Sequence, residues 1–428
     1  MKLFVPATLI ALATSVAAEC SQIAGNYYCS ETSKVIYQNI GFSGSYQDVT
    51  NMDETSGKCT QETVNFSGSM TPLDEELSVH FRGPLKLKQF GVYYPATGNS
   101  KRADTEDCVE KHVHHKHKRA TAVAYETQTV WIDGDGKPAT SGTPTSTGAA
   151  AGTTPIAQGK AIVPTTYSVL PSDATASASG SVPSAAAAGD WQRASYYTPG
   201  SASNCTFLNY YGGQGSGIWT STFGNSLSYA NADNSGASSS PVALGDVTIA
   251  SNTEFVVFSD TKCTDGSGCG YYRKNIPAYH GFGGQNKIFV FEFEMPSSSA
   301  TGFNGDMPAV WLLNAKIPRT LQYGDATCSC WATGCGELDL FEILSTGSNK
   351  LITHLHDGQG VEAGNPYGGG GSQDYFARPT SGSLKAAVIF SGEEIHVQIV
   401  EEDFDEVLTS DTVAKWLAVP GSLASIGY

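Results

Sequence analysis

The chain of 428 residues is long enough for two domains, yet only 15% of its residues are charged. Its formal net charge of −16 argues against nucleic-acid partners, whose phosphates require a basic surface, whereas an uncharged polymer remains compatible. Beyond the first residues no segment reaches the length of a membrane span, and residues 424–428 are not the long apolar tail of a lipid-anchor signal.

The start of the chain has the pattern of a secretory signal. Met1 and Lys2 precede an apolar run that ends in small residues before Glu19, which predicts cleavage after Ala18. The run is too short for a transmembrane anchor. We therefore expect a signal peptide at residues 1–18 and a secreted protein. Ten cysteines, all beyond the cleavage point, fit an oxidising compartment.

These cysteines fall into two groups, and their even number permits complete pairing. One group lies in the first quarter of the chain and the other in the last half, so each group could close on itself, and we expect Cys205 to pair within the second. Cys263 and Cys269 bracket a Gly-rich turn and are a reasonable pair; the rest of the connectivity stays open. Zinc binding is the weaker interpretation, because no Cys-x-x-Cys pair occurs. We expect neither a metal nor another cofactor.

Residues 19–110 are predicted to form a β-rich segment, because short apolar runs such as 34–39 and 62–66 are separated by Gly, Ser and Asn. Asn65 and Asn204 head N-glycosylation sequons, which predicts that both lie at the surface. Pairing of Cys205 would restrict access to Asn204.

Residues 111–190 are predicted to be a spacer. The basic, His-rich run at 111–119 could bind a transition metal through clustered imidazoles. The favoured interpretation is an exposed segment that ends in a dibasic processing site at Lys118-Arg119. Residues 139–189 are mainly Ala, Ser, Thr, Pro and Gly, too poor in large apolar side chains to form a core, so we expect a flexible linker with O-linked sugars.

Residues 191–428 are predicted to form a compact all-β domain. Short strands with turn-rich spacing indicate two antiparallel sheets stacked as a sandwich, and we expect these strands at 247–250, 254–259, 288–295, 309–313, 338–344, 351–354, 386–390 and 395–399. The only helix expected here is a short one, residues 411–417.

One stretch, residues 336–342, gathers three carboxylates. Glu337 and Asp339 share a face of the predicted strand because side chains alternate, but in a regular strand Glu342 would point into the core. A β-bulge at residues 340–341 would return Glu342 to the acidic face. Neighbouring like charges cannot all ionise freely, so at least one carboxyl is expected to keep its proton near neutral pH. Two carboxyls roughly 5 Å apart, one ionised and one protonated, are the groups that a retaining glycosidase needs. The alternative interpretation is a solvated acidic edge strand.

This stretch resembles the catalytic strand of glycoside hydrolase family 16, in the bulged Glu-x-Asp-x-x-Glu form of laminarinase-like β-1,3-glucanases. Met307–Leu313 resembles that family's Trp-Pro-Ala-x-Trp-Leu-Leu strand, with Met307 in the place of the first Trp. Trp331–Gly336 is similar to the Trp-Pro-x-x-Gly approach to the first Glu, and Thr353–His356 to the Thr-x-His element beside the catalytic strand.

Residues 83–94 resemble the closing strand of the same family, which there follows the catalytic strand. Its early position here is what a circular permutation would give. Nearly the whole chain outside the linker is similar to a fungal cell-wall group, the probable circularly permuted β-1,3-glucanases. An independent wall-binding module at residues 19–110 is the alternative.

The resemblance implies a concanavalin-like β-sandwich, or jelly roll, and gives each acid a role. Glu337 would be the nucleophile and Glu342 the general acid/base, while Asp339 would hydrogen-bond to the nucleophile. His356 would orient this cluster, and His354 is an open alternative. For substrate binding we expect the rings of Trp311 and Trp331 to stack on sugars; Tyr271, Tyr272 and Tyr279 are better explained as core.

The implied function is that of a secreted, retaining endo-β-1,3-glucanase or glucan-remodelling transglycosylase acting on β-glucan of the fungal cell wall. A non-catalytic glucan-binding or structural wall protein is the second hypothesis, and a metal-binding protein built on the His-rich run is the third. The sequence does not determine the oligomeric state.

Overall fold

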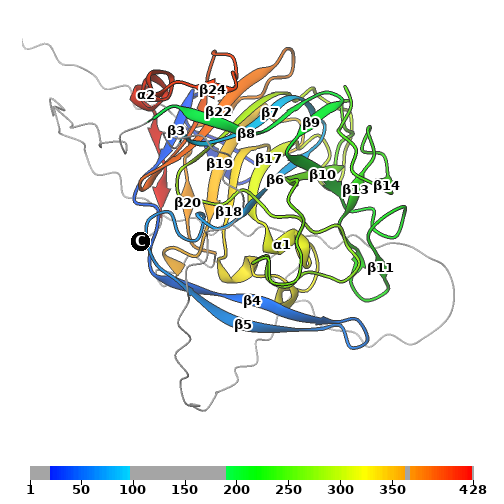
Figure 1. Ribbon diagram of the computed structural model, residues 1–428. Coiled ribbons are helices and arrows are strands. Elements are labelled where there is room, and N and C mark those ends of the chain that lie inside the picture. Colours follow the sequence, from blue (N-terminus) through cyan, green and yellow to red (C-terminus); the bar gives the residue numbers. More distant parts are fainter. Residues whose placement is uncertain (1–19, 97–188, 362–366, 427–428) are drawn as a thin grey trace, which may run out of the picture. The chain divides into compact units, whose positions relative to one another are not determined.

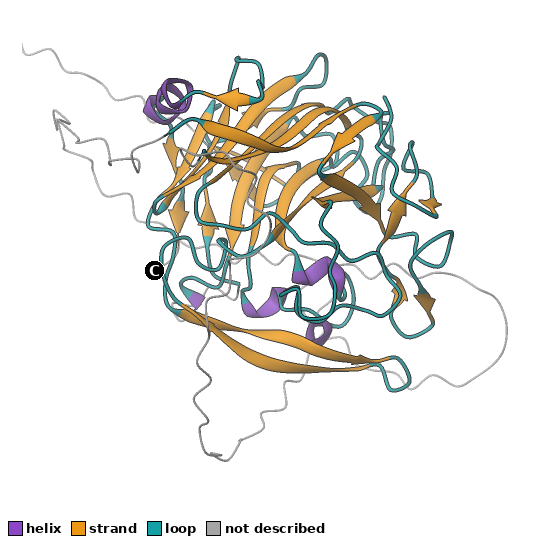
Figure 2. Cartoon of the chain, in the orientation of Figure 1, coloured by secondary structure: helices purple, strands orange, loops and turns teal. Residues whose placement is uncertain are grey.

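The computed structural model describes residues 20–96, 189–361 and 367–426, and strands dominate them (Figure 2). The predicted signal peptide, the His-rich run, the dibasic site and most of the linker lie outside the described residues. Within the described part of the chain, no helix is both long enough and apolar enough to cross a membrane.

The first large sheet carries the acidic strand near its middle (Figure 1). Its strands, in order of pairing, are β14 (Ala237–Ser238), β13 (Ser228–Ala230), β10 (Cys205–Asn209), β15 (Glu254–Ser259), β6 (Leu77–Arg82), β17 (Ala309–Asn314), β18 (Glu337–Glu342), β19 (Lys350–His356), β20 (Gly370–Gly371) and β26 (Ser425–Ile426), with β21 (Phe376–Ala377) also paired to β19.

The second large sheet is antiparallel except for its parallel β3–β25 pair. Its order is β24 (Val407–Leu408), β8 (Trp191–Thr198), β7 (Lys86–Pro95), β16 (Lys287–Glu294), β22 (Leu384–Ser391), β23 (Glu394–Ile399), β3 (Lys34–Tyr37) and β25 (Ser422–Leu423), with β9 (Ser201–Ser203) beside β8.

Three hairpins and a few short helices complete the described fold. The hairpins are β1 (Ser21–Ile23) with β2 (Asn26–Tyr28), β4 (Gly44–Asp53) with β5 (Lys58–Phe66), and β11 (Trp219–Thr220) with β12 (Gly224–Asn225). The helices are α1 (Lys316–Arg319), α2 (Ser410–Ala418) and the 3-10 turns η1 (Ala326–Cys328) and η2 (Trp331–Thr333).

Strands from the N-terminal segment lie inside both sheets. β6 pairs with β15 on one side and β17 on the other, and β7 lies between β8 and β16. The core between the sheets joins these strands to later ones: the ring of Phe81 stacks on Phe255, with centroids 4.7 Å apart, and meets Phe291 edge-on at 6.2 Å. Burying an aromatic ring of this size contributes about 1.5–3 kcal/mol.

The expected all-β sandwich is confirmed, with a few local differences. The helix predicted at residues 411–417 is α2, and the side chains of Val413 and Trp416 cover the outer face of the second sheet. The strand predicted at 247–250 is wrong: Ile249 forms only an isolated bridge to Leu85. The short helix α1 was not expected.

The disulfides correct the prediction of two self-contained cysteine groups. Cys59 of the β4–β5 hairpin is bonded to Cys328 in η1, across 269 residues of sequence. Cys263–Cys269 is confirmed, and the remaining bonds are Cys20–Cys29 and Cys330–Cys335. Cys205 is buried and forms no disulfide with any described cysteine, contrary to expectation; Cys108 lies outside the described residues.

Strand β19 ends at His356, and the next residue, Asp357, turns into the protein interior, where it is fully buried. One carboxylate oxygen accepts the amide N–H of Gln359 at 2.9 Å, and the other has no hydrogen-bond partner among the described residues. Burial therefore raises the pKa of Asp357 from 3.8 to about 6.

The first prediction concerns the shared core. Phe81→Ala should lower the free energy of unfolding by about 3–5 kcal/mol, because it leaves a cavity beside Phe255 and Phe291. Tryptophan fluorescence during urea unfolding measures this, since every tryptophan lies after residue 130. Tyr27→Ala, at a side chain 48% exposed, is the control. An unchanged tryptophan transition in Phe81→Ala would mean that residues 20–96 fold independently.

The second prediction concerns Asp357. Because the pKa of Asp357 is about 6 in the folded protein and near 4 in the unfolded chain, the protonated side chain adds most to stability below pH 4. This contribution is lost as the pH rises through 6 and the buried carboxyl ionises. Asp357→Asn should therefore raise the melting temperature at pH 8, with a gain in unfolding free energy of at most about 3 kcal/mol. At pH 4 it should change the melting temperature little. Thermal unfolding at the two pH values checks this, with exposed Asp260→Asn as control. A gain of equal size at both would contradict it.

Candidate active site

A β-bulge in β18 places the acidic side chains. Across β17, Trp311 is opposite Asp339 while the adjacent Val310 is opposite Phe341, so Leu340 is an extra residue. Across β19, Asp339 is opposite His354 and Glu342 opposite Ile352, again one residue out of register.

The side chains that make up the bulge point away from the acids. Leu340 and Phe341 are both fully buried in the core between the sheets. Glu342 is therefore on the same face as Glu337 and Asp339, where a strictly alternating strand would have buried it. The predicted bulge is confirmed.

Glu337 lies at the start of the strand, beside the η2 turn. The indole Nε1–H of Trp331 donates a hydrogen bond to a carboxylate oxygen of Glu337. The Cys330–Cys335 disulfide closes this turn just before the strand, and Gly336 links them with φ at +111°, which a residue with a side chain rarely adopts. The turn therefore holds the tryptophan against the first acid.

Asp339 is the most buried of the three acids, at 6% exposed. Its carboxylate is 3.5 Å from Nε2 of His356, and its backbone carbonyl accepts the hydroxyl of Thr353 at 2.6 Å. The rings of His354 and His356 are 4.5 Å apart, so both imidazoles predicted from the sequence lie on this face. His356 contacts the Asp339 carboxylate, and His354 is opposite Asp339 in the strand pairing.

Glu342 pairs with an arginine from the N-terminal segment. The guanidinium Nη2 of Arg82 is 3.2 Å from Glu342, and its Nε–H donates to the carbonyl of Met307 at 2.7 Å. In the sheet, Ala309 stands between Arg82 and Glu342, and its small side chain leaves room for the arginine to reach across.

A fourth acid, Glu254 of β15, stands opposite Arg82 on its other side. Burial raises the pKa of Glu254, and the Arg82 charge opposes this rise only in part. The hydroxyl of Tyr323 is 3.0 Å from the Glu254 carboxylate. Burial lowers the pKa of the Arg82 guanidinium, but Glu342 and Glu254 raise it by more, so Arg82 stays charged between two carboxyls.

The acidic face is covered over β6 and β17 and partly open from β18 to β20. Trp311 is 4% exposed: it stacks on His80 with ring centroids 5.0 Å apart and packs in a cluster with Tyr46 of the β4–β5 hairpin. Little of its ring is left for a ligand. Trp331 is half-buried, and Tyr367, 46% exposed, lies against it with centroids 5.0 Å apart.

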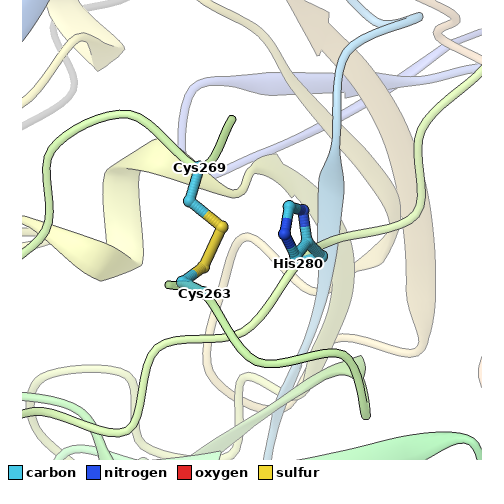
Figure 3. Close-up of side chains that lie close together, drawn as sticks. All are labelled: Cys263, Cys269 and His280. Carbon is cyan, nitrogen blue, oxygen red and sulfur yellow. A yellow bond between two sulfur atoms is a disulfide. The ribbon is translucent and has the colours of Figure 1, made fainter. Parts of the chain in front are cut away.

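The group with metal-ligand spacing in the described residues lies elsewhere, around Cys263, Cys269 and His280 (Figure 3). Its two sulfur atoms are bonded to each other, and a disulfide does not offer the thiolates that metal ions bind. His280 in turn contacts the Glu76 carboxylate through Nδ1.

The three tyrosines that we expected in the core differ: Tyr279 is buried, and Tyr271 and Tyr272 are half-buried. Asn65 and Asn204 are both exposed, as expected.

Sequence reasoning missed Arg82, Glu254, Asp357 and Tyr367. A signal for Arg82 was present: in β6, Leu77, Val79 and Phe81 alternate with polar residues, which indicates a strand with one polar face. Nothing local identified its partner, because Glu342 follows 260 residues later.

Comparisons with known proteins agree with this architecture. Family models for the C-terminal and N-terminal parts of the cell wall protein YJL171C/Tos1 match residues 189–416 and 33–95. No solved structure matches the chain significantly.

Curated relatives align along nearly the whole chain. The chain is 57% identical to the probable circularly permuted 1,3-beta-glucanase TOS1 of Candida albicans, covering 99% of this chain and 98% of that protein. Identity is 50% to TOS1 of Saccharomyces cerevisiae (96% and 95% covered) and 34% to a probable circularly permuted 1,3-beta-glucanase of Arthroderma benhamiae (98% and 97%). The chain belongs to the YJL171C/Tos1 family of cell wall proteins.

Proposed function

We propose that this protein is a retaining glycoside hydrolase or transglycosylase that acts on β-1,3-glucan of the fungal cell wall. The observation that carries the proposal is the bulge at Leu340, which puts Glu342 on the same face as Glu337 and Asp339. The printed names of the relatives, which describe probable 1,3-beta-glucanases, support the same chemistry.

In the proposed reaction the acids act in two steps. Glu342 gives its proton to the glycosidic oxygen while Glu337 attacks the anomeric carbon, so the sugar–oxygen bond breaks and a glycosyl-enzyme ester forms. Glu342, now a carboxylate, then takes a proton from water, or from a sugar hydroxyl, which displaces Glu337. Water gives hydrolysis, and a sugar gives transglycosylation.

The surrounding groups have supporting roles in this proposal. The Trp331 N–H hydrogen bond orients Glu337 for attack, and the contact with His356 holds Asp339 between the two glutamates. The adjoining rings of Trp331 and Tyr367 offer apolar surface on which a glucose ring can stack. Trp311 is covered by other residues, so it would pack against Arg82 and not against the sugar.

We infer that the protein is exported through its N-terminal signal and acts in the wall. Such an enzyme works on an insoluble neutral polymer, for which a non-basic surface is no obstacle. Cleavage at Lys118-Arg119 and sugar attachment at Asn65 and Asn204 are parts of the same proposal.

The third prediction tests the catalytic assignment. Glu337→Gln and Glu342→Gln should each lower the release of products from laminarin oligosaccharides by about 10³-fold or more, because each removes a group that the two steps require. Product chromatography measures the loss.

Glu401→Gln is the matched control, since Glu401 is exposed and borders the second sheet. Unchanged product release by either active-site variant would remove the assignment. Retained glucan binding with no turnover by the unmodified protein would instead identify a glucan-binding wall protein.

A further inference from the structure

We propose that Arg82 and Glu254 are positioning residues that control the charge on Glu342, and that the three side chains form one unit that holds a single exchangeable proton. This inference rests on the proposed function, because it explains how Glu342 can be an acid in one step and a carboxylate in the next.

The geometry places the three groups in one line across the sheet. Glu254, Arg82, Ala309 and Glu342 are successive partners in the pairing of β15, β6, β17 and β18. Alanine is the only member of this line without a long side chain. The arginine therefore has a carboxylate on each side, and the Met307 carbonyl fixes its orientation.

Charge balance gives this line its function. With both acids ionised, the unit carries one net negative charge in a largely buried place, since the side chains of Arg82 and Glu342 are 10% and 12% exposed. Uptake of one proton makes it neutral, which burial favours. The proton can then be on Glu342 while Arg82 pairs with Glu254, or on Glu254 while Arg82 pairs with Glu342.

The first arrangement is the one that can protonate the substrate, and loss of its proton leaves both acids ionised and the unit with one net negative charge. When Glu342 releases its proton to the glycosidic oxygen, the new carboxylate gains the Arg82 ion pair seen in the structure. When Glu342 takes a proton from water in the second step, Arg82 is free to return to Glu254. The second oxygen of Glu342 is buried and has no hydrogen-bond partner among the described residues.

Other described groups around Glu342 do not replace this pair. On its own strand the next charged group is Asp339, and the neighbouring strand β19 contributes His354 and His356. Tyr28 of β2 is close enough that the Glu342 charge, after burial, raises the pKa of its phenol, so it stays neutral near pH 7. Tyr323 donates a hydrogen bond to the Glu254 carboxylate at 3.0 Å.

The test uses the pH dependence of kcat/KM, whose basic limb marks loss of the proton from the general acid. Glu254→Gln leaves Arg82 to Glu342 alone, which stabilises the Glu342 carboxylate, so the limb should move to lower pH by about one unit. Arg82→Gln removes the cation, so the limb should move up by about one unit. Arg82→Lys keeps the charge and should stay near the unmodified profile.

Opposite displacements are the expected result, and a structural role alone would not produce them. Lys385→Gln breaks a different ion pair, between Lys385 of β22 in the second sheet and Asp403, and is the control. Melting temperatures establish that each variant is folded; if Arg82→Gln is not, Glu254→Gln and Arg82→Lys carry the test. Limbs that do not move, or that move in the same direction, overturn the inference while leaving the proposed function intact.

A second readout separates the two proposals. Carbon-13 NMR of labelled glutamate carboxyls, with Glu342 assigned from Glu342→Gln, follows the Glu342 proton without any substrate. Opposite displacements of its titration in Glu254→Gln and Arg82→Gln support the proton unit. If they occur in a protein that turns over no glucan, the proposed function fails and the unit stands; parallel or absent displacements overturn the unit.

Discussion

One extra residue in a strand determines what this protein's acidic face can do. Side chains of a strand alternate between faces, so acids at positions 337, 339 and 342 cannot share a face unless one residue is left out of the count. Leu340 is that residue, and it packs in the core next to Phe341 rather than distorting the face above. The same bulge keeps Leu340 and Phe341 in the hydrophobic core and brings the three carboxylates to one face of the strand.

Side chains from several parts of the chain surround the acidic strand. Arg82 comes from the N-terminal segment, while Trp331 and His356 come from elements that flank β18 in sequence. The β4–β5 hairpin, tied to η1 by Cys59–Cys328, covers Trp311 and leaves the β18–β20 side of the face partly open. Residues 20–96 thus contribute both a charge partner and a cover to a site whose acids lie 250 residues later.

The sequence predicted the local features of the site and missed those that join distant parts of the chain. The bulge followed from the Glu337–Glu342 spacing, and the α2 helix was expected at residues 411–417, because both are features of neighbouring residues. The Arg82–Glu342 pair and the Cys59–Cys328 bond join segments more than 250 residues apart, which no local pattern encodes. Trp311 was expected to face a sugar, yet the β4–β5 hairpin covers it; the sequence predicted a strand at residues 62–66 but not where that strand would pack. The buried Asp357 was missed because a single acid after a strand ordinarily indicates a solvated turn.

The most direct test of the central claim is to trap the covalent intermediate. A laminaribiosyl fluoride with fluorine at C2 forms the glycosyl-enzyme but slows its breakdown, so the labelled peptide can be identified by mass spectrometry. Our account predicts one sugar adduct per chain, attached to Glu337, and its absence from Glu337→Gln. An adduct on Glu342 or another residue, or products whose anomeric configuration is inverted, would contradict it.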